Sequence, residues 1–234
     1  MGGNSTGIYK SLNCGLDSSD NKKNILKNLT FVQKKINSTS NKILLLNQIH
    51  SNKFYFIDKK LRINNNNKFE GDALVTNRSN TPIGILTADC APILLFDQKN
   101  KTIAAIHAGW KGAYKGIVKK VIEFMIKKGS SAKNITAVVG PCIAIKNYEV
   151  QQDFVKKFIK KDLKSKLFFK KIGNKNYFSL NKYISYQLNS LGIKKIEVIN
   201  KDTFNKKNNF FSARRSKIHN SNDYGRNISV IMIN

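Results

Sequence analysis

The sequence predicts an α+β fold in which mixed β-sheets are flanked by helices, all in a single domain over residues 1–234. Short runs of branched and aromatic residues, separated by polar or Gly/Pro/Asn connectors, are typical of strands. A few longer stretches carry apolar residues at helical spacing. Because many connectors between the expected strands are of hairpin length, this mixture favours mixed sheets over a doubly wound parallel sheet. A chain of 234 residues can bury a substantial core in one domain.

The first expected element is a helix over 22–36, where four apolar residues recur at helical spacing between lysines. Further helices are expected over 117–125, ending near Gly129, and then around 154–159 and 180–191. The expected strands are 42–46, 53–57, 72–76, 83–87, 92–96, 102–107, 135–140, 195–199 and 227–233, and the Asn-rich stretch 64–68 is expected to be a loop.

The composition is strongly basic, with a formal net charge of +28. Of the 42 basic residues, however, only five are arginine, the side chain that recognises phosphates and base edges with a fixed fork. Lysine, asparagine and isoleucine are abundant throughout, which indicates a bias of the whole chain rather than a built binding surface. We therefore expect no specific nucleic-acid partner, and keep a basic nucleic-acid-binding protein as the non-enzymatic alternative.

No apolar segment reaches the length of a membrane span, and the first residues lack the apolar core of a signal peptide. We therefore expect a cytoplasmic protein without a membrane partner, and a monomer rather than an oligomer. The three cysteines, Cys14, Cys90 and Cys142, are odd in number and far apart. A disulfide framework is not expected, so each thiol is considered separately.

Three soft side chains follow apolar runs: His50 in "NQIHSNKF", Cys90 in "TADCAP" and His107 in "AIHAGW". We expect each to lie where a strand gives way to a loop, the usual place for functional side chains on a sheet scaffold. Two imidazoles and a thiolate form a coherent ligand set for zinc. Three protein ligands leave the fourth tetrahedral position for water, as in a catalytic site. The alternative is a packed cysteine and two hydrogen-bonded histidines, because the spacings match no local zinc motif.

Several segments together resemble the laccase-domain family, also called multicopper polyphenol oxidoreductases. The resemblance runs from about residue 7 to the C-terminus. Its most specific segments are "TADC" and "HAGW". The others are "GIYKSLNCGLDSSD", "NQIHSNKF", "GDALVTN", "VVGPCIAIKNYEV" and "NNFFSARRSK".

The resemblance implies an α+β fold with mixed sheets and a zinc site formed by His50, Cys90 and His107. It also implies phosphorolysis of adenosine, inosine and methylthioadenosine, with deamination of adenosine. Two departures stand near the C-terminus: Asp202 replaces the cysteine that the family often has there, and the loop between Arg215 and Arg226 is longer. Neither affects the expected ligands, but both concern contacts with substrate.

A purine nucleoside and phosphate are thus the expected partners, and phosphorolysis requires anion binding near the ribose. Arg214, Arg215 and Arg226 are candidate phosphate ligands, since guanidinium binds phosphate through two parallel hydrogen bonds. The alternative for the adjacent pair is a solvated loop or a structural ion pair. Asn47 and Gln48 are candidates for contacting the nucleoside or for capping a strand.

Asp89, next to Cys90, is the first carboxylate to consider for proton transfer during deamination. Alternation along a strand would point it away from the metal. We therefore expect Asp89 to orient the loop or a ligand instead.

Two rival activities would use the same three residues. A multicopper oxidase needs more histidines than the three in this chain, although a single copper ion remains an alternative occupant of the site. A Cys90 nucleophile with a histidine base would give an amide hydrolase. Metal content separates this hydrolase from the metal-dependent enzyme, because a metal-bound thiolate is not free to attack. Trp110, the only tryptophan, is either a core residue or a surface on which a purine stacks.

Overall fold

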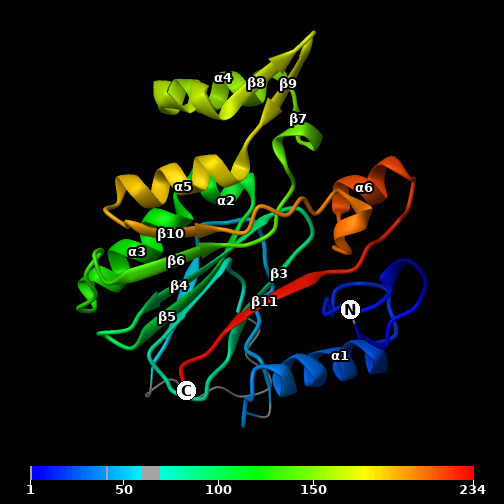
Figure 1. The fold of residues 1–234 in the computed structure, drawn as a ribbon, viewed down its shortest axis with the longest axis vertical. Coiled ribbons are helices and arrows are strands. Elements are labelled where there is room, and N and C mark those ends of the chain that lie inside the picture. The colour runs from blue at the N-terminus through cyan, green and yellow to red at the C-terminus, as the bar shows by residue number, and fades with distance from the viewer. Residues whose placement is uncertain (1, 41, 59–68) are drawn as a thin grey trace.

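A six-stranded mixed sheet forms the centre of the fold in the computed structural model, which describes residues 2–40, 42–58 and 69–234 (Figure 1). The expected loop at 64–68 lies outside these residues. The spatial order is β1-β2-β5-β4-β6-β10, with the outer pairs β1–β2 and β6–β10 parallel and the inner pairs antiparallel. The strands are β1 (Phe54–Ile57), β2 (Ala73–Thr76), β4 (Ala91–Asp97), β5 (Thr102–Ala108), β6 (Ile135–Val139) and β10 (Lys195–Val198).

Among the described residues, two smaller antiparallel sheets accompany the central one. β3 (Ile83–Thr87) pairs with β11 (Asn227–Ile231), and β9 (Lys175–Phe178) lies between β7 (Glu149–Val150) and β8 (Phe169–Ile172). The predicted α+β class with mixed sheets is confirmed. In the described part of the chain, no helix is long and apolar enough to cross a membrane.

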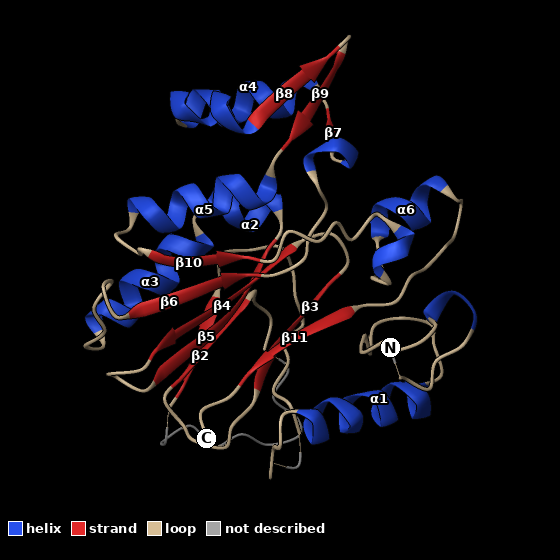
Figure 2. Cartoon of the chain, viewed as in Figure 1, coloured by secondary structure: helices blue, strands red, loops and turns tan. Residues whose placement is uncertain are grey.

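Helices cover the sheets from several sides (Figure 2). α2, α3 and α5 lie along the central sheet, α1 lies below the β3–β11 pair in the view, and α4 lies with β8 and β9 in a projection at the top (Figure 1). Their bounds are α1 (Lys22–Lys35), α2 (Trp110–Lys115), α3 (Ile117–Lys127), α4 (Gln152–Lys161), α5 (Leu180–Ser190) and α6 (Ala213–Ile218).

β5 is buried along its whole length, and its side chains divide between two apolar clusters. Ala104, Ile106 and Ala108 face the larger cluster, formed with α3 and α5. Ile103 and Ala105 face the second cluster, formed with β3. Because side chains alternate along a strand, His107 must share the second face. Burial on both faces also explains why this strand reads as a continuous apolar run.

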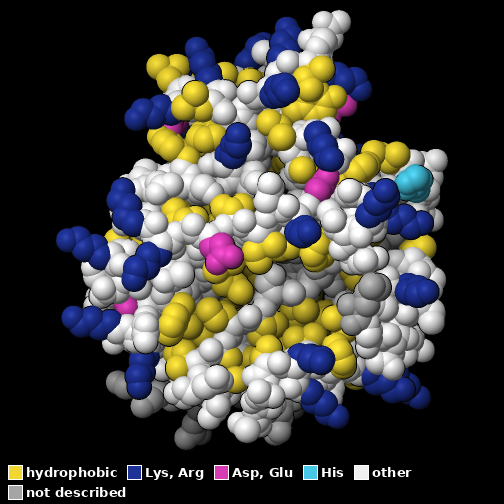
Figure 3. All heavy atoms as spheres, in the orientation of Figure 1, with side chains coloured by type: hydrophobic (Ala, Val, Ile, Leu, Met, Phe, Trp, Pro, Cys, Tyr) yellow, Lys and Arg dark blue, Asp and Glu magenta, His cyan; other side chains and the backbone are white. Residues whose placement is uncertain are grey.

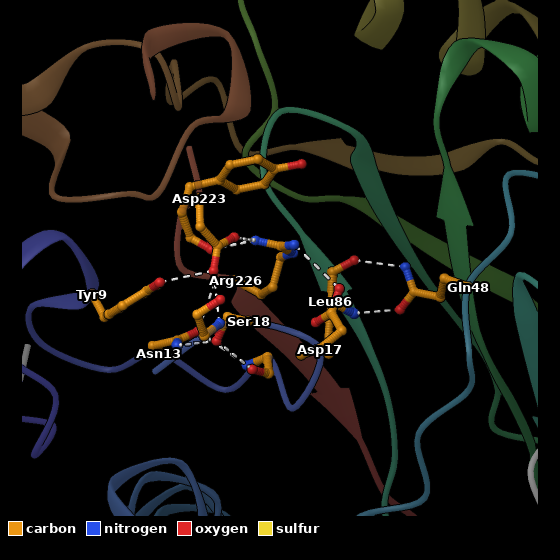
Figure 4. Close-up of polar contacts among 11 residues, drawn as sticks. Tyr9, Asn13, Asp17, Ser18, Gln48, Leu86, Asp223 and Arg226 are labelled. Carbon is orange, nitrogen blue, oxygen red and sulfur yellow. Dashed lines mark hydrogen bonds and ion pairs between the residues drawn. The ribbon is translucent and has the colours of Figure 1, made fainter. Parts of the chain in front are cut away.

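The segment 42–46 was expected to be a strand, and this expectation is wrong. It makes a single bridge, between Leu44 and Ile83. Where the next step of the ladder would form, the side-chain amide of Gln48 pairs instead with the backbone N–H and C=O of Leu86, both at 2.7 Å. Because of this side-chain pairing, the segment does not continue as a strand beside β3. Figure 4 shows the two hydrogen bonds between Gln48 and Leu86.

Three features of the fold were not expected from the sequence: α2, α6 and the β7–β9–β8 sheet. The two helices have only six residues each, too few to display a helical period. Gly116, at φ 84°, ends α2 in the left-handed conformation and separates it from α3. In the small sheet most side chains are exposed or half-buried, so no apolar run marks its strands.

Candidate metal centre

The pairing of β4 with β5 brings Cys90 and His107 together. In this antiparallel register Pro92 lies opposite His107, so Cys90, directly before β4, stands beside the end of β5. Alternation places Cys90, Pro92 and His107 on one face of the sheet, the face toward β3. The sequence predicts that each ligand lies where a strand gives way to a loop. Cys90 does lie in the loop between β3 and β4, whereas His107 lies within β5 and His50 follows a segment that is not a strand. Antiparallel pairing of β4 with β5 makes Cys90 and His107 adjacent.

His50 reaches the same place from a turn held by a buried carboxylate. Its φ of 55° is left-handed, a conformation uncommon for residues other than glycine. The carboxylate of Asp72 accepts hydrogen bonds from the backbone N–H groups of His50 and Ser51 and from the Ser51 hydroxyl. Asp72 therefore fixes the turn that carries the exposed ring of His50.

Asp72 also orients the second histidine. Its Oδ1 lies 2.8 Å from Nδ1 of His107, and its side chain is fully buried. Because an ionised carboxylate only accepts hydrogen bonds, Nδ1 carries the proton and Nε2 is left as the metal-binding nitrogen. Sequence reasoning missed Asp72. The one available signal was an acidic residue entering an otherwise apolar strand in "GDALVTN".

The donor atoms of His50, Cys90 and His107 all lie within 4.8 Å of one another. The Cys90 sulfur and Nε2 of His50 are 3.8 Å apart. In a tetrahedral zinc site, with bonds of about 2.3 Å to sulfur and 2.0 Å to nitrogen, this separation would be about 3.5 Å. For this pair of donors, a contraction of a few tenths of an ångström would reach the tetrahedral separation. The three residues can thus hold a metal, and the geometry leaves zinc or copper open.

Gly109 keeps the space between the donors open. A Cβ atom at this position would lie 2.8 Å from the Cys90 sulfur and 3.0 Å from Cδ2 of His50. Both separations are shorter than normal contacts, so any side chain here would push the thiol and the imidazole apart. The close approach of these two donors therefore requires glycine at this position of the "HAGW" segment.

The electrostatics of the cluster favour an ionised thiol. Burial opposes the charge on Cys90, but the positive charge of His107 and hydrogen bonds from both histidines outweigh it and lower the pKa of the thiol to about 6. Burial likewise opposes the charge on His107, but the thiolate and the Asp72 carboxylate raise the pKa of its imidazole to about 9. The thiolate form that binds metals is thus already favoured near neutral pH.

Two cavities meet at this cluster. The larger, of about 580 Å³, is lined by all three metal-binding candidates and by apolar residues, including Leu45, Leu46, Phe69 and Leu86. The smaller, of about 320 Å³, is lined by His50 and Cys90 on its near side and by Arg214 and Lys217 of α6. Tyr224 lines both cavities. Both volumes lie in the range of roughly 300–1,000 Å³ that is typical of small-molecule sites.

Three of the predicted substrate contacts line the larger cavity: Asn47, Gln48 and Arg226. Gln48 is already engaged with the backbone of Leu86, and the Asn47 side chain donates to Glu70. Figure 4 shows Arg226 reaching from the C-terminal segment to Asp17 of the N-terminal segment. Its guanidinium donates to Asp17 and to the Tyr224 carbonyl, and its carbon Cζ lies 3.9 Å from the centre of the Tyr224 ring.

The adjacent arginines have different surroundings. The guanidinium of Arg215 donates to three backbone carbonyls and does not line either cavity. Arg214 lines the smaller cavity. Its guanidinium donates to the Glu149 carbonyl and lies over the Tyr148 ring.

Asp89 connects the Cys90 loop to α6. Its φ is 90°, and its carboxylate accepts hydrogen bonds from the Thr203 and Ser212 hydroxyls and from the backbone N–H of Arg214. None of these partners is a metal-binding candidate. The side chain therefore fixes the position of the loop against α6.

The remaining sequence features lie away from the cavities. Trp110 packs against Phe154 and Phe158 of α4, with ring centres 4.9 and 6.5 Å away. His219 follows α6 and is exposed. Lysine and arginine side chains are spread over the visible face without forming one continuous patch (Figure 3).

The family of the chain follows from its whole length. Residues 1–234 match the family described as multi-copper polyphenol oxidoreductase laccase. The chain belongs to this family. A purine nucleoside phosphorylase of Haemophilus influenzae is 36% identical over 233 residues, covering 98% of this chain and 90% of the relative. A purine nucleoside phosphorylase of Rickettsia prowazekii is 37% identical over 176 residues, covering 74% of this chain and 71% of the relative.

Solved structures share the fold. The crystal structure of the hypothetical protein YfiH from Bacillus licheniformis has a TM-score of 0.90 at 27% identity and covers 100% of this chain and 90% of its own. A Neisseria meningitidis protein has a TM-score of 0.86 at 28% identity, with 100% and 91% covered. The predicted resemblance to the laccase-domain family is thus confirmed.

Replacement of Asp72 by asparagine tests whether this carboxylate orients the metal ligands. The amide is isosteric but can present its N–H₂ group to His107, which removes the acceptor that fixes the tautomer. We expect the dissociation constant for zinc, measured by chelator competition, to rise about 10–100-fold. Asp153→Asn, at the start of α4 and away from both cavities, is the matched control. Equal zinc affinity in Asp72→Asn and wild type would contradict the role assigned to Asp72.

Alkylation of the metal-free protein tests the state of Cys90. Iodoacetamide reacts with the thiolate, which predominates at a pH above the pKa of the thiol. Because the two histidines lower the pKa of Cys90 to about 6, its labelling should rise with pH through a midpoint near 6. Cys14 and Cys142, whose pKa values burial raises to about 12, should stay unlabelled. Peptide mass spectrometry reads out each site. A midpoint near the ordinary thiol value of about 8.5 would show that the histidines do not stabilise the thiolate.

Proposed function

We propose that this protein is a single-domain, zinc-dependent purine nucleoside phosphorylase. Its substrates would be adenosine, inosine and methylthioadenosine, cleaved by phosphate to the free base and a ribose 1-phosphate, with deamination of adenosine as a second activity. Two findings support the proposal: the relatives are named purine nucleoside phosphorylases, and three metal-binding side chains converge where two cavities meet.

The convergence of the donors beside the larger cavity is the observation that carries the proposal. The lining of this cavity combines apolar residues that suit a purine with polar side chains, in a volume suited to a nucleoside. A bound zinc ion would supply Lewis-acid activation of water or of a substrate oxygen. His50, Cys90 and His107 would hold it, and Asp72 would keep both histidines oriented.

Zinc is preferred to copper because two imidazoles and one thiolate suit a three-ligand catalytic zinc site. Copper binds the same donors and remains the alternative occupant. A copper-dependent polyphenol oxidase is the rival that the family description suggests, and it would oxidise phenols without phosphate.

A cysteine hydrolase is the second candidate, and one contact favours it. In the metal-free protein Asp72 orients His107, and His107 lowers the pKa of Cys90. A carboxylate, an imidazole and a thiolate in this order form the arrangement that activates a nucleophilic cysteine. Amide cleavage by the metal-free protein, abolished when zinc is added, would support this candidate over the phosphorylase.

Adenosine turnover separates the possibilities. Protein with its metal content measured is incubated with adenosine, with and without phosphate, and the products are resolved by chromatography. We expect adenine that depends on phosphate, and inosine that does not. Both should disappear in His107→Ala together with bound zinc, because this variant removes one of three ligands.

The matched control is His219→Ala, which removes a histidine outside both cavities and should keep zinc and activity. Zinc-loaded protein that forms neither adenine nor inosine would overturn the proposed function.

A further inference from the structure

The two cavities differ in chemistry, and that difference assigns them to two substrates. We propose that the smaller cavity is the phosphate subsite, built on Arg214 and Lys217, and that the larger cavity holds the nucleoside with its ribose hydroxyls on Asp17. The inference rests on the proposed function and divides that site into two named halves. The halves share His50, Cys90 and Tyr224, so the bond to be cleaved would lie at their junction.

The hydrogen-bond and ion-pair partners of the three arginines show which guanidinium can bind an anion. Arg226 is balanced by two carboxylates, Asp17 at 3.1 Å and Asp223 at 3.7 Å. The guanidinium of Arg215 donates hydrogen bonds to three backbone carbonyls of residues that line neither cavity. Arg214 binds one carbonyl oxygen, which leaves several of its five N–H donors for another acceptor.

The smaller cavity carries a net positive charge, because Arg214 and Lys217 outnumber Asp89, the one carboxylate among its described lining residues. Across residues 2–40, 42–58 and 69–234, no carboxylate lies within ion-pair distance of the Arg214 guanidinium or the Lys217 ammonium. The carboxylate of Asp89 already accepts three hydrogen bonds, from two hydroxyls and one backbone N–H, and pairs with neither cationic side chain. An arginine and a lysine facing one cavity suit a tetrahedral oxyanion such as phosphate.

In the larger cavity, apart from the metal-binding candidates, one carboxylate and one guanidinium face each other, those of Asp17 and Arg226. Asp17 is the one carboxylate among its described lining residues, and 64% of its side chain is exposed. Arg226 binds one of its oxygens, which holds the carboxylate in place and leaves lone pairs for other donors. Vicinal hydroxyls of a ribose are suitable donors, as for the acidic residue that binds the ribose of dinucleotides. Phe69 and the neighbouring leucines supply the apolar surface for the base.

This arrangement suits the atoms that move in phosphorolysis. An oxygen of phosphate forms a bond to C1′ while the bond from C1′ to the purine nitrogen breaks. The electron pair leaves with the purine, which takes up the proton that the attacking hydrogen phosphate gives up, and ribose 1-phosphate is the second product. Phosphate attacks C1′ on the side opposite to the departing purine. The two groups must therefore lie on opposite sides of C1′. Two cavities that meet at a shared edge satisfy this requirement.

The phosphate subsite is tested with Arg214→Ala and Lys217→Ala in the zinc-loaded full chain. Lys120→Ala, an exposed lysine of α3 outside both cavities, is the control for loss of one charge. We expect KM for phosphate to rise about tenfold in Arg214→Ala, the loss of a charge-assisted hydrogen bond, and to rise in Lys217→Ala. KM for adenosine should stay at the wild-type value. Unchanged KM for phosphate in both variants would overturn the assignment.

Calorimetric titration with inorganic phosphate alone separates this inference from the proposed function. If wild type binds phosphate, and both variants lose that binding relative to Lys120→Ala, the subsite stands even where no adenosine is turned over. If the enzyme phosphorolyses adenosine but the variants bind phosphate like wild type, the function stands and the subsite falls.

The nucleoside half is tested with Asp17→Asn and a substrate that lacks the diol. We expect wild type to prefer adenosine over 2′,3′-dideoxyadenosine, and Asp17→Asn to reduce that ratio of kcat/KM about tenfold, with KM for phosphate unchanged. The control is Asp153→Asn, which removes an acid outside both cavities. An unchanged ratio in Asp17→Asn would show that this carboxylate does not bind the ribose.

Discussion

The carboxylate of Asp72 is the interaction on which the site depends. It is fully buried, yet it accepts hydrogen bonds from a histidine ring, two consecutive backbone N–H groups and a serine hydroxyl. These donors offset the cost of burying a charge and keep the pKa of the carboxyl below its ordinary value despite its burial. One group thus fixes the tautomer of His107 and the left-handed turn that presents His50.

The third donor is placed by the sheet rather than by Asp72. Antiparallel pairing of β4 with β5 sets Cys90 beside His107, and Gly109 leaves the space that the thiol and imidazole occupy. Behind the loop, Asp89 ties the backbone to α6, the helix that carries Arg214. One donor, Cys90, is therefore linked to the cationic wall of the smaller cavity through the hydrogen bonds of Asp89, its neighbour in the chain.

The sequence predicts most of the fold because strands buried on both faces, such as β5, leave unmistakable apolar runs. It fails at 42–46, where the side chain of Gln48 replaces a backbone ladder, a substitution that no local pattern marks. The three candidate ligands could be selected from residue type and from the family resemblance. Asp72 could not, because its role arises from partners 21, 22 and 35 residues away. The different surroundings of three similar arginines are likewise non-local.

X-ray absorption at the zinc edge tests the central claim most directly, that one metal ion is held by His50, Cys90 and His107 together. The spectrum of the zinc-loaded protein should show one sulfur at about 2.3 Å and two imidazole nitrogens at about 2.0 Å, with one further light atom. In Cys90→Ser the sulfur shell should vanish while both imidazoles remain. A zinc shell without sulfur, or with fewer than two imidazoles in the wild-type protein, would contradict the account.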